Sequence, residues 1–386
     1  MTIKTILLRA LTPIVMLSAT AQLKAQQQYT IQGTLGKDKQ GKILLTYTDP
    51  NDKYVRDSAE VKNGVFVMSG TIAEPAHATL ELNPTGLGLG PDSDIQDLFL
   101  DPGKITVTST SGLLKATITG GESQADFGRF MAELKVVGDQ GKKLDTLYQK
   151  YSADGNDEGL KSIHAEAQKL AQKRKEIQDT FVKEHPDSFV AFSLWLRRVK
   201  GSVIDVPIVE PGFNAFSTKI RNSATGKMMA KRIAMAKSLE PGNPIIDFTL
   251  PDTSGKMVSL SSFKGKNVLL CFWYRNFMPF ETFSFLMTKV NKLPASYNLA
   301  VVSVYHNIDE SDWKSVLKEN GMTWTNLIDK DGIVNGKQVS EVAKAYDLVA
   351  SDPLQWILIG ADGKVICRHF NLAGDPVADV KKLLTK

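Results

Sequence analysis

The chain is poor in cysteine, and this scarcity limits its chemistry. Its 386 residues contain two cysteines, Cys271 and Cys367. A disulfide-rich scaffold is excluded, because such scaffolds are small and dense in cysteine. A large exported chain can fold without any disulfide, so a bond between these two thiols has to be argued from their positions.

The sequence also lacks a concentrated basic segment and the motifs of common cofactor sites. Its formal net charge is +5, but the lysines are scattered among acidic residues, which argues against a nucleic-acid interface. Residues 85–94, TGLGLGPDSD, are rich in glycine, yet no Gly-Lys-Ser/Thr follows, so we interpret them as a flexible loop. His164 and His185 have no partners at metal-ligand spacing. We therefore expect no cofactor and no metal.

The first 25 residues have the order of a secretory signal peptide. Lys4 and Arg9 precede the apolar run LTPIVMLSATA, and small residues follow up to Ala21 or Ala25. The run is shorter than the roughly 20 residues that span a bilayer, and no cysteine follows it for lipid attachment. We expect residues 1–25 to be cleaved, the mature chain to have no transmembrane segment, and the protein to reach the periplasm or cell envelope. A retained membrane anchor is the alternative.

The hydrophobic pattern divides the rest of the chain into three regions. Residues 26–121 contain short alternating runs between turn residues, which predict an antiparallel β-sandwich-like domain of unknown function. In residues 122–240 apolar positions recur every three to four residues, which predicts a helical region. In residues 241–386, strand-like runs alternate with helical stretches at 279–293, 309–320 and 338–347, which predicts an α/β domain. Its last two strands are joined by ADGK, a sequence typical of a tight hairpin.

The last region resembles the thioredoxin-like domain of TlpA/ResA-type proteins, which are related to AhpC/TSA peroxiredoxins. The segment NPIIDFTLPDTSGKMVSLSSFKGKNVLLCFW carries the entry pattern, and VVSVYHNIDESDWKSVLKENGMTWTNLIDKDG and AYDLVASDPLQWILIGADGKVI follow in order. The resemblance implies a C-terminal thioredoxin fold over about 140 residues, at the domain size expected for one compact unit.

In that family the strand ending in Phe-Trp is followed by a Trp-Cys-x-Pro-Cys turn, where a helix N-terminus lowers the pKa of the first thiol. Residues 276–280 here read Asn-Phe-Met-Pro-Phe, so Phe277 and Phe280 stand at both cysteine positions. A phenyl ring cannot attack a disulfide. Peroxiredoxins place a threonine three residues before their reactive cysteine, and Met278 and Glu281 stand there instead. The resemblance therefore implies a pseudo-active site without catalytic residues.

The two cysteines of the chain are expected to lie on different strands. Cys271 falls where thioredoxins often carry a buried acid, and we expect it to be buried, poorly ionised and inert. Cys367 follows the hairpin turn, and the resemblance places the QWILIG strand between the two. Two strand steps separate their α-carbons by roughly 9–10 Å, and a disulfide needs less than about 7 Å. We therefore predict no disulfide between them.

A binding surface remains after the cysteines are lost. Thioredoxin-like folds hold a proline opposite the active turn, and the residue before it offers backbone hydrogen bonds to an extended peptide; Pro353 and Asp352 fit these positions. In the alternative, Phe280 and Phe283 pack inside the helix and Phe277 caps the turn. The predicted binding residues are Trp273, Phe277, Met278, Phe280, Asp352, Pro353 and Leu354.

These patterns favour a non-catalytic protein that binds another protein or a peptide in the envelope. The alternative is a thiol-disulfide oxidoreductase of the TlpA/ResA type that acts through Cys271. A third possibility is a catalytic or metal site at His306, Asp309 and Glu310, but these acids are explained more simply as the start of a helix. The oligomeric state is not indicated by the sequence.

Overall fold

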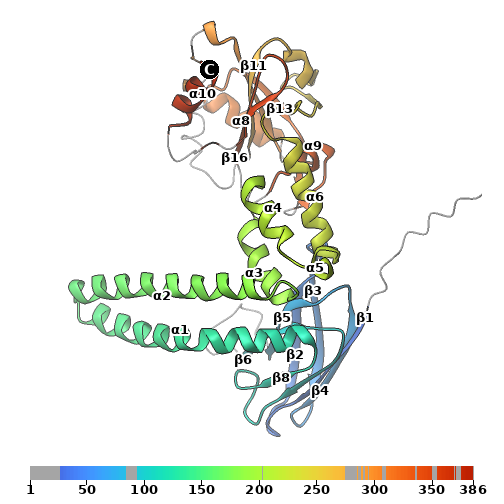
Figure 1. Cartoon of the computed structure of the whole chain (residues 1–386), viewed down its shortest axis with the longest axis vertical. Helices are drawn as coiled ribbons and strands as arrows, with labels where there is room; N and C mark the ends of the chain where they lie inside the picture. Colours follow the sequence, from blue (N-terminus) through green and yellow to red (C-terminus); the bar gives the residue numbers. More distant parts are fainter. Residues whose placement is uncertain are drawn as a thin grey trace, which may run out of the picture.

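The computed structural model describes residues 27–83, 94–201, 203–273, 285, 288–289, 292–293, 295–306, 310–334, 337–349, 354–368, 370 and 375–385. Figure 1 shows a β-rich body from which a long helical arm projects sideways, while further helices connect the body to a C-terminal domain. The predicted fold class is confirmed: a β-rich start, a helical middle and a thioredoxin-like end. The predicted signal peptide, residues 1–25, lies outside the described residues. The domain boundaries after residues 121 and 240 stay predictions.

The β-rich body consists of two four-stranded sheets, ordered β4-β1-β7-β8 and β3-β2-β5-β6. Alternating residues point between the sheets, as the period of a strand requires, and Ile31, Ile43, Leu45 and Leu80 are completely buried there. The strands are β1 (Gln27–Thr34), β2 (Gly41–Thr48), β3 (Tyr54–Val61), β4 (Val65–Ile72), β5 (Ala76–Leu82), β6 (Asp94–Leu100), β7 (Gly103–Thr108) and β8 (Thr117–Thr119).

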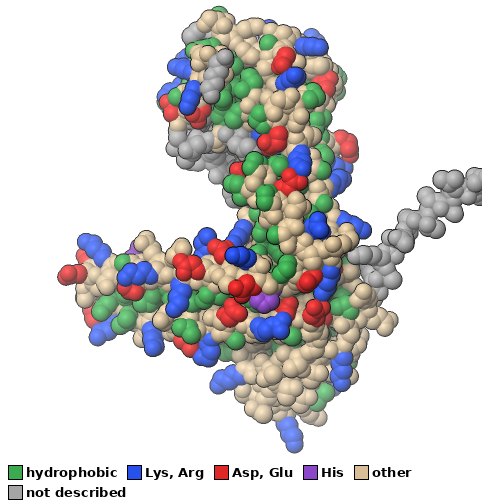
Figure 2. Space-filling model, in the orientation of Figure 1, with side chains coloured by type: hydrophobic (Ala, Val, Ile, Leu, Met, Phe, Trp, Pro, Cys, Tyr) green, Lys and Arg blue, Asp and Glu red, His purple; other side chains and the backbone are tan. Residues whose placement is uncertain are grey.

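The arm is an antiparallel pair of long helices, α1 (Glu122–Ala153) and α2 (Asp157–Glu184). At its base the Phe130 and Phe181 rings lie 5.1 Å apart. Farther out, most side chains are exposed, and Figure 2 shows basic and acidic groups mixed along the arm. No helix in the described ranges is long and apolar enough to cross a membrane.

Four shorter helices follow: α3 (Phe189–Val199), α4 (Val206–Asn214), α5 (Thr218–Arg221) and α6 (Ala224–Ser238). α3 begins at a serine cap, because the Ser188 hydroxyl accepts hydrogen bonds from the backbone N–H groups of the next turn. Trp195, Phe213 and Phe216 form the core of these helices. Phe99 of β6 joins the same core, so α3 is packed against the β-rich body.

The C-terminal domain is built on a five-stranded sheet, ordered β13-β12-β11-β16-β17. Its central strand, β11, runs parallel to β12 and antiparallel to β16. Both faces of β11 are covered, which is why its sequence is a continuous apolar run. The domain contains β9 (Thr249–Pro251), β10 (Met257–Ser259), β11 (Asn267–Trp273), β12 (Leu299–Tyr305), α8 (Glu310–Glu319), β13 (Thr325–Ile328), β14 (Ile333–Val334), β15 (Lys337–Gln338), α9 (Glu341–Ala345), β16 (Leu354–Ile359), β17 (Val365–Cys367) and α10 (Pro376–Leu384).

The connection after α6 is hydrogen-bonded to the edge strand β17. The Gly242 N–H donates to the Val365 carbonyl at 2.8 Å, and the Val365 N–H donates to the Asn243 carbonyl at 2.9 Å. Ile245 donates its N–H to the Gly363 carbonyl at 2.9 Å. These backbone hydrogen bonds attach the segment after α6 to the C-terminal domain. The segment also covers β17, which would otherwise be an exposed edge strand of the sheet.

Candidate functional site

The candidate site lies at the end of the sheet where β11 ends and the neighbouring strand β16 begins (the β11–β16 edge). Trp273, the last residue of β11, is paired in register with Leu354, the first residue of β16. In the chain, the predicted turn follows Trp273 and the predicted proline segment precedes Leu354. The two parts of the predicted binding surface are thus attached to adjacent strand ends. Phe277, Met278, Phe280, Asp352 and Pro353 themselves lie outside the described residues.

Aromatic side chains form the interior beneath these strand ends. Trp273 is 2% exposed and Leu354 5%, so both side chains belong to the core. The Trp273 ring lies 4.7 Å from the Tyr305 ring, centroid to centroid. The Tyr305 hydroxyl donates to Asp312 Oδ2 at 3.1 Å, which ties β12 to the first turns of α8. Sequence reasoning missed Tyr305 and Asp312; the nearly continuous apolar run LAVVSVY was the available signal for the tyrosine.

Cys271 lies inside the sheet core, as predicted. It is fully buried two residues before Trp273 and is paired in register with Trp356 of β16. Burial raises the pKa of the Cys271 thiol well above its usual range, because a thiolate would lose its hydration there. Since the thiolate is the attacking form, this thiol is a poor nucleophile in the folded protein.

Cys367 lies on the other side of β16 from Cys271. Leu358 of β16 is paired with Leu269 of β11 on one side and with Cys367 of β17 on the other. The predicted separation of the two cysteines by one strand is therefore confirmed. Neither cysteine lies at the very end of the sheet, where Trp273 of β11 pairs with Leu354 of β16.

His306 follows β12 at the same edge of the sheet and is 3% exposed. Its backbone N–H donates to the Trp273 carbonyl at 3.2 Å. Burial lowers the pKa of the His306 imidazole to about 4, so the ring is neutral at pH 7. Glu310 begins α8, as the helix interpretation predicts, and Asp309 lies outside the described residues.

The histidines of α2 are likewise explained by position. His164 is exposed, and the His185 ring stacks on Phe181 at 4.1 Å while its Nδ1 lies 3.0 Å from the Phe181 carbonyl oxygen. Over the part of the chain that the structure describes, no three His, Cys, Asp or Glu side chains converge to hold a metal ion.

Comparison with known proteins supports the assignment of the C-terminal domain. Residues 240–384 match the family model Redoxin, and residues 29–127 match a domain of unknown function, DUF4369. The thiol-disulfide oxidoreductase ResA of Bacillus thuringiensis subsp. konkukian is 32% identical over 134 residues, which cover 34% of this chain and 69% of that protein. This chain belongs to the TlpA/ResA-type thioredoxin-like family.

Other members of the family give the same match. ResA of Bacillus subtilis is 31% identical over 133 residues, covering 34% of this chain and 67% of that protein. The solved thioredoxin domain of a thiol-disulfide oxidoreductase from Bacteroides vulgatus is 27% identical and covers 38% of this chain and 99% of that chain, with a TM-score of 0.33. Both ResA proteins are named as thiol-disulfide oxidoreductases, whereas the sequence between Trp273 and Leu286 contains no cysteine.

Proposed function

We propose that this TlpA/ResA-type protein binds another protein or an extended peptide at the β11–β16 edge without exchanging disulfides. The observation that supports this most directly is the position of Cys271. It is the cysteine nearest to the predicted turn, yet it is fully buried and burial raises the pKa of its thiol. Dithiol exchange needs an accessible thiolate and a second thiol to resolve the mixed disulfide.

The proposed binding mode uses backbone and apolar contacts. An extended peptide lies across the ends of strands β11 and β16 and forms hydrogen bonds with the backbone of Asp352, before Pro353. Phe277, Met278 and Phe280 supply apolar contact area to the peptide. The buried side chains of Trp273 and Leu354 support this surface from below. We further propose export by the N-terminal signal peptide to the periplasm or cell envelope.

Binding at the turn is tested by a matched pair of phenylalanine substitutions. Phe277→Asp places a charge at the centre of the proposed contact, and we expect retention of envelope partners to fall about tenfold or more in quantitative pull-downs. Phe285→Asp is the control, because Phe285 is 58% exposed and lies outside the proposed contact set. Identical partner sets for the wild type and both variants would show that the turn is not the binding site.

A second candidate function is thiol-disulfide exchange through Cys271. The names of the relatives favour it, since both ResA proteins are thiol-disulfide oxidoreductases. In this mechanism the Cys271 sulfur would attack a substrate disulfide, and one substrate sulfur would leave as a thiolate. β11 would have to open first, because the thiol lies in the centre of the sheet.

Insulin reduction in the presence of dithiothreitol distinguishes the two candidates. We expect the wild type, Cys271→Ser and Cys367→Ser to give the same rate as dithiothreitol alone, because no accessible thiolate is available for catalysis. Turbidity from the released insulin B chain provides the measurement, with thioredoxin as the positive control. A wild-type rate above background that Cys271→Ser abolishes would overturn the binding proposal in favour of exchange.

A further inference from the structure

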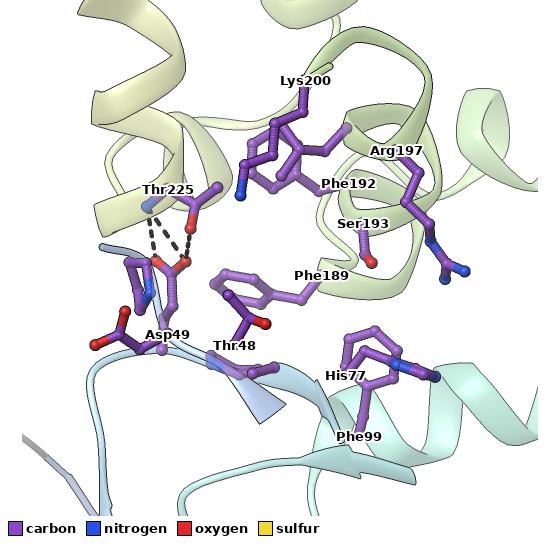
Figure 3. A pocket seen from close by; sticks show the side chains of 15 residues that line it. Thr48, Asp49, His77, Phe99, Phe189, Phe192, Ser193, Arg197, Lys200 and Thr225 are labelled. Carbon is purple, nitrogen blue, oxygen red and sulfur yellow. Dashed lines mark hydrogen bonds between the residues drawn. The ribbon is translucent and has the colours of Figure 1, made fainter. Parts of the chain in front are cut away.

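A cavity of about 310 Å³ lies between the β-rich body and α3, remote from the β11–β16 edge. Figure 3 shows its arrangement: His77 and Phe99 rise from the sheet below, Phe189 and Phe192 come from α3, and Thr225 from α6 closes one side. All of its lining residues are among those that the structure describes. The family assignment of the C-terminal domain gives this cavity no role.

The floor of the cavity is aromatic and held in place by the core. Phe99 is 1% exposed and Phe192 is 3% exposed. The Phe192 ring packs edge-on against Phe216 at 5.2 Å, and the His77 ring packs edge-on against Phe99 at 5.8 Å. Because these rings are already fixed, an apolar ligand group would meet a preformed surface and lose little binding energy to ordering the protein.

One positive charge at this cavity has no hydrogen-bond or ion-pair partner among the residues that the structure describes. Arg197 lines the cavity and is exposed to solvent, and its guanidinium forms no ion pair or hydrogen bond with any described residue. The Ser193 hydroxyl, one helical turn earlier on α3, also lines the cavity and likewise forms no hydrogen bond within the described ranges. Figure 3 shows both on the α3 side of the cavity. A guanidinium beside a hydroxyl is a donor set suited to a carboxylate.

The acidic side chains that line the cavity and Lys200 all have partners in the described part of the chain. Lys200 pairs with Asp52, and both Glu74 carboxylate oxygens accept from Thr225, with the N–H of that residue at 3.1 and 3.2 Å. Asp49 accepts two backbone N–H bonds from the turn that follows it, each at 2.8 Å. Arg197 is thus the lining cation that has no ionic partner among the described residues, and the Glu74 and Asp49 carboxylates disfavour a polyanion.

We propose that this cavity binds a small hydrophobic monocarboxylate. Its apolar body lies against Phe99, Phe189 and Phe192, and its carboxylate accepts hydrogen bonds from the Arg197 guanidinium and the Ser193 hydroxyl. Arg197 also lines the adjoining cavity of about 790 Å³, so the carboxylate lies where the two cavities meet and the ligand enters from the larger one. This inference is independent of the function proposed for the β11–β16 edge.

Calorimetric titration of the full chain with phenylacetate tests the proposal. We expect saturable binding with a dissociation constant near or below about 1 mM, and binding of the neutral analogue phenylacetamide weaker by about tenfold or more. Arg197→Gln should weaken phenylacetate binding by about tenfold and leave phenylacetamide binding unchanged. Arg198→Gln is the matched control, because Arg198 is the next residue of α3 and contacts Asp179 and Gln178 instead.

A second variant tests the position of the ligand rather than its charge. Ser193→Phe fills the cavity from α3 and should abolish binding of both the acid and the amide, while far-UV circular dichroism confirms that the helices are retained. Equal affinities for acid and amide would overturn the proposal. So would equal effects of the Arg197 and Arg198 substitutions, unchanged binding in Ser193→Phe, or no binding of phenylacetate at millimolar concentration.

Discussion

Replacement of Arg232 by methionine is expected to lower the free energy of unfolding by about 3–5 kcal/mol, because it removes one partner of a buried ion pair. Arg232 Nε donates to Asp347 Oδ1 at 2.8 Å and Nη2 donates to Oδ2 at 2.9 Å. The side chains are 12% and 3% exposed, respectively. Arg232 Nη1 also donates to the Lys200 carbonyl at 2.7 Å. The substitution leaves the Asp347 carboxylate buried without its bidentate cation.

This ion pair connects three parts of the chain. Arg232 lies on α6, Lys200 caps the end of α3, and Asp347 lies in the C-terminal domain just after α9. A few residues away, Arg368 Nη1 donates to the Ala236 carbonyl at 2.7 Å across the same junction. Loss of the Arg232 contacts should therefore loosen the packing of the C-terminal domain on α6, and it should also increase proteolysis at residues 239–246.

A double-mutant cycle separates the ion pair from general damage to the junction. Asp347 has φ 48°, a left-handed conformation that asparagine tolerates, so Asp347→Asn removes the charge without adding backbone strain. We expect the double variant Arg232→Met/Asp347→Asn to be more stable than Arg232→Met alone, since no unpartnered carboxylate remains. Glu341→Gln is the control: it breaks an ion pair whose side chains are 43% and 90% exposed and should cost under about 1 kcal/mol.

Urea denaturation followed by tryptophan fluorescence provides the measurement. Four of the five tryptophans, Trp273, Trp313, Trp324 and Trp356, lie in the C-terminal domain, so the signal reports the unit that carries Asp347. A cost below about 1 kcal/mol for Arg232→Met, or strict additivity in the cycle, would mean that the ion pair does not stabilise the junction.

The strands of the sheet that carries the candidate site were predictable, because short continuous stretches of the sequence determine them. The unbroken apolar run of β11 indicates a strand covered on both faces, and the ADGK turn indicates the hairpin that joins β16 and β17. Together with the strand order that the family resemblance implies, these two features place Cys271 and Cys367 on strands separated by β16. The serine cap of α3 is equally local, since the hydroxyl bonds to N–H groups only two and three residues away.

The contacts between regions were not predictable in the same way. Arg232 and Asp347 are 115 residues apart, and neither local sequence, KMMAKRIAMA or AYDLVA, indicates the other as its partner. The cavity beside α3 draws residues from three strands, two connecting segments and two helices, so no spacing pattern links Phe99 to Arg197. Which of two adjacent arginines lines a cavity depends on how α3 rotates against the sheet, and that is decided by tertiary packing.

Acidification is expected to destabilise the C-terminal domain through His306. The imidazole has a pKa near 6.5 in the unfolded chain, whereas burial lowers its pKa to about 4 in the folded protein. Between these values the unfolded state binds more protons than the folded state. As far as His306 is concerned, the free energy of unfolding is therefore at its full value above pH 6.5 and falls as the pH drops towards 4. A shift of this size corresponds to about 3 kcal/mol of unfolding free energy.

The expected result is best measured as a difference between variants, because other groups titrate in the same range. Burial raises the pKa of the Asp329 carboxyl, which works in the opposite direction: the folded state takes up that proton first, so acidification favours folding. This contribution is common to the wild type and to His306→Gln and cancels between them. Urea denaturation at about pH 7, 6, 5 and 4.5 should therefore show the wild type losing stability relative to His306→Gln. His164→Gln, at an exposed position on α2, should follow the wild type. Parallel curves for the wild type and His306→Gln would mean that His306 is protonated at the same pH in the folded and unfolded chains.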